Sequence, residues 1–112
     1  MRAKACAIVV ALLLAACSSQ TPRERLAQRV TVALASGDFS GVQSLFAPTA
    51  ATTRVEIAED ADELAAQGAL KSVREETSCD PGWHCFRAIF ERGALTEHAR
   101  LNGEGRIVGW YL

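Results

Sequence analysis

The apolar residues of this chain change their spacing at Gly68, and this change constrains the fold more than any other feature. Between residues 21 and 67, apolar side chains recur every three or four residues, which is typical of amphipathic helices. From Ala69 onward, apolar side chains recur at roughly every second residue, and turns that contain glycine separate the segments. This pattern is typical of antiparallel strands. Helical segments grouped before strands predict an α+β domain with the helices on one face of the sheet.

Three helices are predicted before the change. The first begins with a capping box, in which Thr21 is the N-cap and Glu24 its partner. Asp38 caps the second helix, and this role accounts for its carboxylate without any catalytic one. The third carries an acidic face from Glu56 to Glu63, interpreted as a solvated surface because the spacing is not that of a calcium loop. The helices are predicted to span residues 21–37, 38–48 and 55–68.

Four strands are predicted next, as an antiparallel meander. The second has Phe86 and Phe90 on one face and Arg87 on the other, because successive strand residues point in opposite directions. Asn102 and Gly103 begin a hairpin turn, since both accept a positive φ. The last strand has few polar residues and is expected to pack on both faces. The strands are predicted to span residues 69–78, 85–92, 95–101 and 106–112.

The N-terminal segment differs from the rest of the chain in composition. Arg2 and Lys4 precede an uncharged apolar run, residues 5–16, which has the length of a signal-peptide core and is too short to span a bilayer. The run leads into LAAC, residues 14–17, which resembles the lipobox of bacterial lipoproteins. In that family a peptidase cuts before the cysteine, and the thiol carries a diacylglyceryl group. The resemblance implies a signal peptide over residues 1–16, a lipidated tether over 17–20 and one domain over 21–112.

Acylation of Cys17 implies a protein that sits on a membrane without crossing it, with membrane lipid as its first partner. Each buried methylene contributes roughly 0.8 kcal/mol, and two or more acyl chains suffice for stable anchoring. In Gram-negative members of the family, a serine at the position of Ser18 favours the outer membrane over the inner one. The expected location is therefore the bacterial cell envelope. The alternative is an ordinary secretory signal in which Cys17 occurs by chance.

Charge and composition argue against a nucleic-acid partner. The chain is 22% charged, its formal net charge is −1, and no basic stripe is present. Removal of the signal peptide takes away two basic residues and makes the remainder more acidic. It also takes away Cys6, and lipidation uses Cys17. Cys79 and Cys85 then remain as thiols, in a compartment where disulfides persist.

The heptapeptide CDPGWHC, residues 79–85, admits three interpretations. Cys79, Asp80, His84 and Cys85 have donor atoms suited to zinc, but a structural zinc site takes a second pair of ligands, which the chain lacks. A redox pair would be spaced as Cys-x-x-Cys. A disulfide clip fits best, because Asp-Pro-Gly-Trp suits a type II turn that sets the cysteines on opposing strands. We predict the Cys79–Cys85 disulfide and no metal ligand; the other two interpretations remain alternatives.

Two segments resemble small bacterial domains with a nuclear-transport-factor-2-like fold. Residues 33–48, ALASGDFSGVQSLFAP, are similar to the first helix, the Gly-Asp break and the second helix of that fold. Residues 101–112, LNGEGRIVGWYL, are similar to its last hairpin. The resemblance implies a curved sheet wrapped around the first helix, a cone that often contains a pocket. Some members, such as ketosteroid isomerases and polyketide cyclases, are enzymes; many others are secreted or lipid-anchored domains of unknown function.

The candidate pocket residues within such a cone are Phe86, Phe90, His98, Trp110 and Tyr111. The aromatic residues are also explained as core, and His98 as a solvated strand residue. No catalytic set can be assigned, because the enzymes of the superfamily place bases and a tyrosine in the cone in a pattern that this chain does not match. We expect a domain without a cofactor that binds a small ligand or an envelope protein, or has a structural role. The alternative is an isomerase- or cyclase-like enzyme acting on a small apolar molecule.

Overall fold

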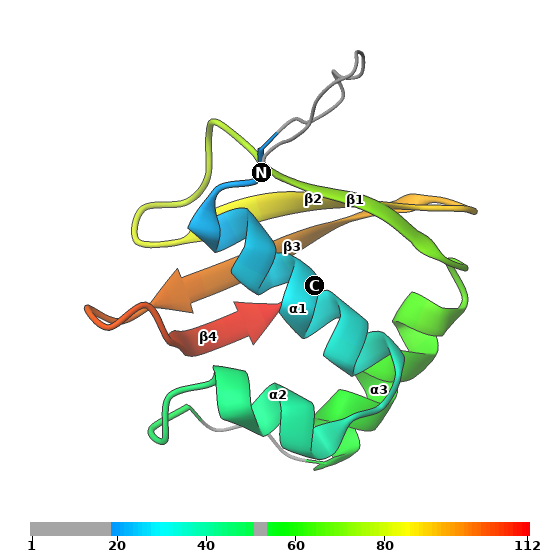
Figure 1. Cartoon of the computed structure of the whole chain (residues 1–112), viewed down its shortest axis with the longest axis horizontal. Coiled ribbons are helices and arrows are strands. Elements are labelled where there is room, and N and C mark those ends of the chain that lie inside the picture. The colour runs from blue at the N-terminus through cyan, green and yellow to red at the C-terminus, as the bar shows by residue number, and fades with distance from the viewer. Residues whose placement is uncertain (1–18, 51–53) are drawn as a thin grey trace.

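The computed structural model describes residues 19–50 and 54–112. Three helices precede a four-stranded antiparallel sheet with the strand order β1-β2-β3-β4, which confirms the predicted α+β class and the order of the elements (Figure 1). The predicted signal peptide and Cys17 lie outside the described residues. The elements are α1 (Pro22–Ala35), α2 (Phe39–Leu45), α3 (Arg54–Ala65), β1 (Leu70–Glu75), β2 (His84–Phe90), β3 (Ala94–Leu101) and β4 (Ile107–Tyr111).

In the described part of the chain, no helix has both the length and the apolar character needed to cross a membrane.

The predicted capping box begins α1. Thr21 Oγ1 accepts a hydrogen bond from the Glu24 N–H at 3.1 Å, and Glu24 Oε1 accepts one from the Thr21 N–H at 2.9 Å. The other oxygen of Glu24 accepts a hydrogen bond from the Glu75 N–H at 2.8 Å. The backbone hydrogen bonds from Glu75 and Thr21 lower the pKa of Glu24. Glu24 therefore ties the start of α1 to the end of β1.

The core lies between α1 and the inner face of the sheet (Figure 1). In β2 the predicted alternation is confirmed, because Phe86 and Phe90 are buried while Arg87 and Ile89 are exposed. Apolar burial of this kind drives folding in proportion to the area removed from water. Apart from the two phenylalanines, the core consists of Ala27, Val30, Leu34, Val42, Phe46, Ile57, Leu64, Val73, Ala88, Ala99 and Ile107.

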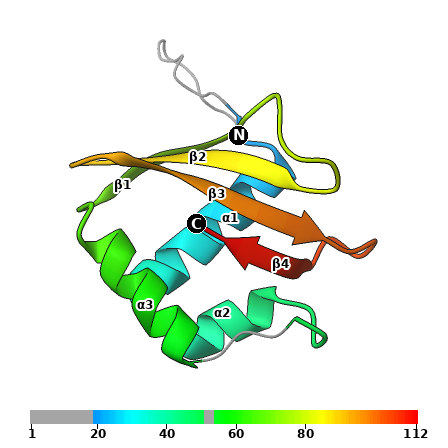
Figure 2. The same ribbon diagram turned by 180° about the vertical axis from the view of Figure 1, so that it is seen from behind.

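The segment that follows α2 is joined to the start of β4. The Ala47 N–H donates a hydrogen bond to the Ile107 carbonyl at 2.7 Å, within a short parallel bridge between Phe46 and Ile107. Arg106 Nη2 donates to the carbonyls of Ser44 and Phe46 at 3.1 and 2.9 Å. As a result α2 and α3 lie on the side of β4 that faces away from β3 (Figure 2).

The predicted disulfide between Cys79 and Cys85 is confirmed. The predicted turn is also present, since the Trp83 N–H donates to the Asp80 carbonyl at 3.0 Å and Gly82 has a φ of 84°. The prediction that both cysteines lie on opposing strands is wrong, because β1 ends at Glu75 and Cys79 lies in the loop beyond it. On the β1 side, the residue hydrogen-bonded to Cys85 is Glu76, whose N–H donates to the Cys85 carbonyl at 2.8 Å.

Candidate functional site

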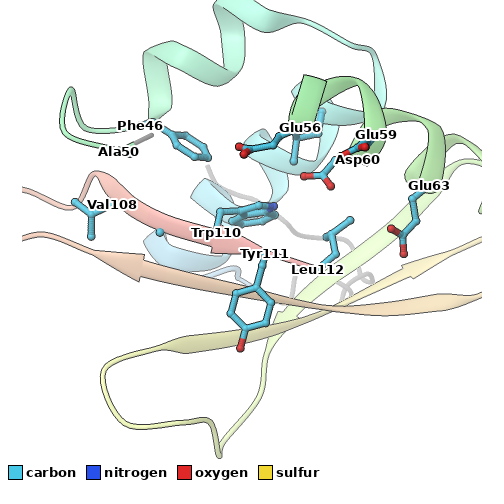
Figure 3. A pocket seen from close by; sticks show the side chains of 12 residues that line it. Phe46, Ala50, Glu56, Glu59, Asp60, Glu63, Val108, Trp110, Tyr111 and Leu112 are labelled. Carbon is cyan, nitrogen blue, oxygen red and sulfur yellow. The ribbon is translucent and has the colours of Figure 1, made fainter. Parts of the chain in front are cut away.

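A groove of about 310 Å³ lies between α3 and β4. Its size is at the lower end of the range for small-ligand sites, roughly 300–1,000 Å³. We call it the α3–β4 groove; Figure 3 shows its wall of acidic side chains above the aromatic and aliphatic residues of the floor. Its lining consists of Leu34, Phe46, Ala50, Glu56, Glu59, Asp60, Glu63, Val108, Gly109, Trp110, Tyr111 and Leu112.

The α3 side of the groove is acidic. Glu56, Asp60 and Glu63 are spaced three or four residues apart, and Glu59 is three residues from Glu56 and four from Glu63, so the four carboxylates lie towards one face of the helix. The three glutamates are exposed at the rim, whereas Asp60 is partly buried. This burial, followed by the negative charges of Glu63, Glu56 and Glu59, raises the pKa of Asp60. None of the described residues that line the groove is basic, so Glu59, Asp60 and Glu63 present negative charge to a ligand.

The floor of the groove is apolar and contains Trp110. Phe46 and Leu34 are buried beneath it, and Trp110 and Leu112 lie below the carboxylates of α3 (Figure 3). The indole Nε1 of Trp110 is shielded from solvent and has no hydrogen-bond partner among the described residues. An aromatic face beside carboxylates attracts a positively charged group both through the ring and through the opposite charge.

The candidate pocket residues from the sequence are divided among three places. Phe86 and Phe90 are core residues, and Trp110 lies on the floor of the groove. Tyr111 lines the groove at β4, but its ring is directed away from the α3 carboxylates (Figure 3) and stacks on His98, with 4.0 Å between the ring centroids. Only Trp110 and Tyr111 of the five therefore meet at the groove.

The outer face of β3 and β4 carries an aromatic cluster that includes Trp83. The rings of Trp83 and Tyr111 meet edge to face, with centroids 5.1 Å apart, and the guanidinium carbon of Arg100 lies 4.6 Å from the Trp83 centroid. A Cβ at Gly109 would come within 3.0 Å of the Trp83 ring. The disulfide loop thus lays Trp83 over the outer face of β4. The last strand is covered in part on this face, although Tyr111 remains 43% exposed.

A second acidic feature, Glu97, is buried between β3 and α1. The Thr31 hydroxyl lies 2.7 Å from Glu97 Oε2 and 2.8 Å from the Ala27 carbonyl, while Glu97 Oε1 has no partner among the described residues. Burial raises the pKa of Glu97 to about 7, against the opposing effect of the Thr31 hydrogen bond. A hydroxyl has a single hydrogen. A protonated Glu97 satisfies the geometry, because it donates to Thr31 while Thr31 donates to Ala27.

The sequence contained signals for both acidic features. The alternation that puts Leu95 and Ala99 on the buried face of β3 puts Glu97 there too, but an isolated glutamate in a strand is easily taken for a surface residue. The acidic face of α3 was visible, but nothing in the sequence indicated that β4 lies opposite it. Among the described residues, no group of three or more His, Cys, Asp or Glu side chains is placed so that it could hold a metal ion.

Comparison with known proteins adds no family: no protein-family model and no curated protein matches this chain.

Proposed function

We propose that this chain is a lipid-anchored protein of a bacterial envelope whose single domain binds a ligand in the α3–β4 groove without transforming it. The ligand combines an apolar part, which contacts Trp110 and the floor, with a positively charged group, which faces Asp60 and Glu63. The three helices and four-stranded sheet support a nuclear-transport-factor-2-like domain as the frame of this groove.

One observation carries the binding role: a concave site in which an acidic wall faces an aromatic and aliphatic floor. Ligand sites are typically apolar clefts with a few polar groups that fix orientation. Among the described residues of the lining there is no histidine, serine, cysteine or lysine, so the hydroxyl, thiol and amine nucleophiles that a neighbouring base commonly activates are absent from this set. The buried Glu97 lies outside the lining as well.

The lipid anchor is supported by the lipobox alone. Substitution of the acylated residue, Cys17→Ser, is expected to abolish incorporation of labelled palmitate and to leave the precursor unprocessed. Unchanged membrane retention of that variant in detergent phase partitioning would contradict the anchor. The groove proposal does not depend on this outcome.

Binding is tested with three probes that share a benzene ring: benzylamine, benzyl alcohol and benzoate. Calorimetric titration of the full chain in detergent micelles near neutral pH is expected to show benzylamine binding most tightly and benzoate not at all. Asp60→Asn is expected to weaken benzylamine binding several-fold, since one partly buried charge is lost. Trp110→Leu removes the aromatic face and is expected to have a similar effect.

A matched control removes an acid away from the groove. Glu104 is exposed in the turn between β3 and β4, so Glu104→Gln changes the net charge as Asp60→Asn does without altering the groove. This variant is expected to bind benzylamine as the unaltered chain does. Equal affinity for the three probes, or an equal loss in Glu104→Gln and Asp60→Asn, would reject a specific cation site.

Asp60 also supports a second candidate function, catalysis in the groove. A partly buried carboxyl with a raised pKa can act as a general acid or base. Besides the neighbouring glutamates, the described lining includes one further titratable residue, Tyr111, whose ring is directed away from Asp60 (Figure 3). Binding is therefore the better-supported role. It predicts that Asp60→Asn lowers the affinity for benzylamine without abolishing binding.

A further inference from the structure

β4 is the last strand of the sheet, and one of its edges has no neighbouring strand among the described residues. In an edge strand, alternate residues direct their N–H and C=O groups away from the sheet. Ala47 pairs with the first of these groups, the Ile107 carbonyl. Beyond Ile107, residues 19–50 and 54–112 provide no further strand on this side. The residues that follow, Val108–Leu112, line the α3–β4 groove instead, and at Gly109, which has no side chain, the main chain itself lines it.

We propose that the occupant of this groove is an extended polypeptide segment with basic side chains, which adds to β4 as a fifth strand. The proposal rests on the binding function above and narrows its ligand. Strand addition of this kind takes affinity from main-chain hydrogen bonds and specificity from alternate side chains. Four residues of β4 and the following Leu112 line the groove consecutively and span roughly 17 Å, which suits an extended chain better than a compact molecule.

Charge identifies which segment fits. The acidic wall extends from Glu56 to Glu63, a rise of roughly 10 Å along α3. Side chains on one face of a strand are spaced about 7 Å apart. Two basic side chains, two residues apart, can therefore both face the wall, and one of them can lie near Trp110. A second copy of this chain is disfavoured at this edge, because its own acidic wall would approach the first.

The other side chains of the segment are expected to be apolar. In a strand added beside β4, alternate residues point to the outer face of the sheet, where Tyr111 and Trp83 lie. Basic and apolar residues therefore alternate in the segment. An edge strand of another envelope protein, or a loop without a pairing partner, can present such a sequence.

The experiment uses capped peptides of about six residues in which arginine alternates with valine. Two isomers carry N-methyl groups, one on the arginine nitrogens and the other on the valine nitrogens. An added strand pairs with β4 along one edge only, so one isomer is expected to lose at least about tenfold in affinity and the other to bind nearly as the parent does. Binding is measured by calorimetry on the full chain in detergent micelles, alongside benzylamine.

A peptide in which glutamate replaces arginine is expected not to bind, and Glu63→Gln is expected to weaken the arginine peptide where Glu104→Gln does not. Benzylamine binding without binding of the arginine–valine peptide overturns strand addition and leaves the groove function intact. The same conclusion follows if both methylated isomers bind alike. If neither benzylamine nor the peptide binds, the strand-addition proposal and the groove function both fail.

Discussion

Glu97 and the acidic wall of α3 are two acidic regions of one small domain, and they differ in almost every physical respect. Glu97 is fully buried and has Thr31 as its hydrogen-bond partner. The wall carries several carboxylates at the rim of a groove. In both places a pKa is raised: for Glu97 by burial alone, for Asp60 by burial and then by neighbouring charges. The comparison indicates that Glu97 affects the stability of the fold, whereas the α3 wall is the region that we propose contacts a ligand.

The largest expected effect concerns the pH dependence of stability at Glu97. Its pKa is about 7 in the folded chain against 4.5 as the ordinary value, so the folded state holds the proton more tightly. The contribution of this proton uptake by Glu97 to the free energy of unfolding is full below pH 4.5, falls as pH rises and is lost by about pH 7. It amounts to roughly 3 kcal/mol.

Glu97→Gln removes this titration while keeping the shape of the side chain. The difference in free energy of unfolding between the unaltered chain and this variant, measured by urea unfolding, is expected to shift by roughly 3 kcal/mol between pH 4.5 and pH 7.5, in the variant's favour at the higher pH. A difference that does not change with pH would mean that folding leaves the pKa of Glu97 at its ordinary value, and the contrast with the α3 wall would fail.

A smaller effect is expected at the partner of Glu97. Thr31→Val keeps the volume but removes the hydroxyl that lies between Glu97 and the Ala27 carbonyl. We expect a loss of about 1–2 kcal/mol in the free energy of unfolding below pH 4.5, because a buried carboxyl loses its partner. When Glu97 ionises, the Thr31 hydroxyl can donate to the carboxylate, and this hydrogen bond opposes the rise in the pKa of Glu97, so the variant should also titrate at a higher pH. An unchanged stability would show that solvent reaches Glu97.

The smallest effect on stability is expected in the α3 wall. Glu63→Gln changes an exposed side chain and should alter the free energy of unfolding by less than about 0.5 kcal/mol. The variant should lower the pKa of Asp60, because Glu63 raises this pKa more than either of the other neighbouring glutamates does. High salt should lower that pKa as well and leave Glu97 nearly unchanged, since buried groups are screened far less. Carboxyl titration by NMR separates the two residues, and equal salt sensitivity would remove the distinction between them.

Local patterns predicted much of the fold. The capping box at Thr21, the alternation in β2 and the turn at Gly82 follow from short-range chemistry, and each is present. The position of Cys79 was not predictable, because whether Glu76 or Cys79 opposes Cys85 depends on the register between β1 and β2.

The candidate site was less predictable than the fold. The groove joins an acidic helix face to the edge of the last strand, and these segments are some fifty residues apart in the sequence. Spacing shows that Glu56 and Glu63 share one face of α3, but only tertiary packing places Trp110 opposite that face. The burial of Glu97 was hard to predict for a different reason. Its charged residue type indicates the solvent-facing side of β3, whereas its position in the alternation indicates the buried side.

The most direct test of the central claim is a backbone amide NMR titration of the full chain with benzylamine. We expect the largest shifts at Asp60, Glu63 and Val108–Leu112, and essentially none at Thr31 or Glu97. Shifts centred on Trp83 and Arg100, or no shifts that saturate, would contradict a ligand site in the α3–β4 groove.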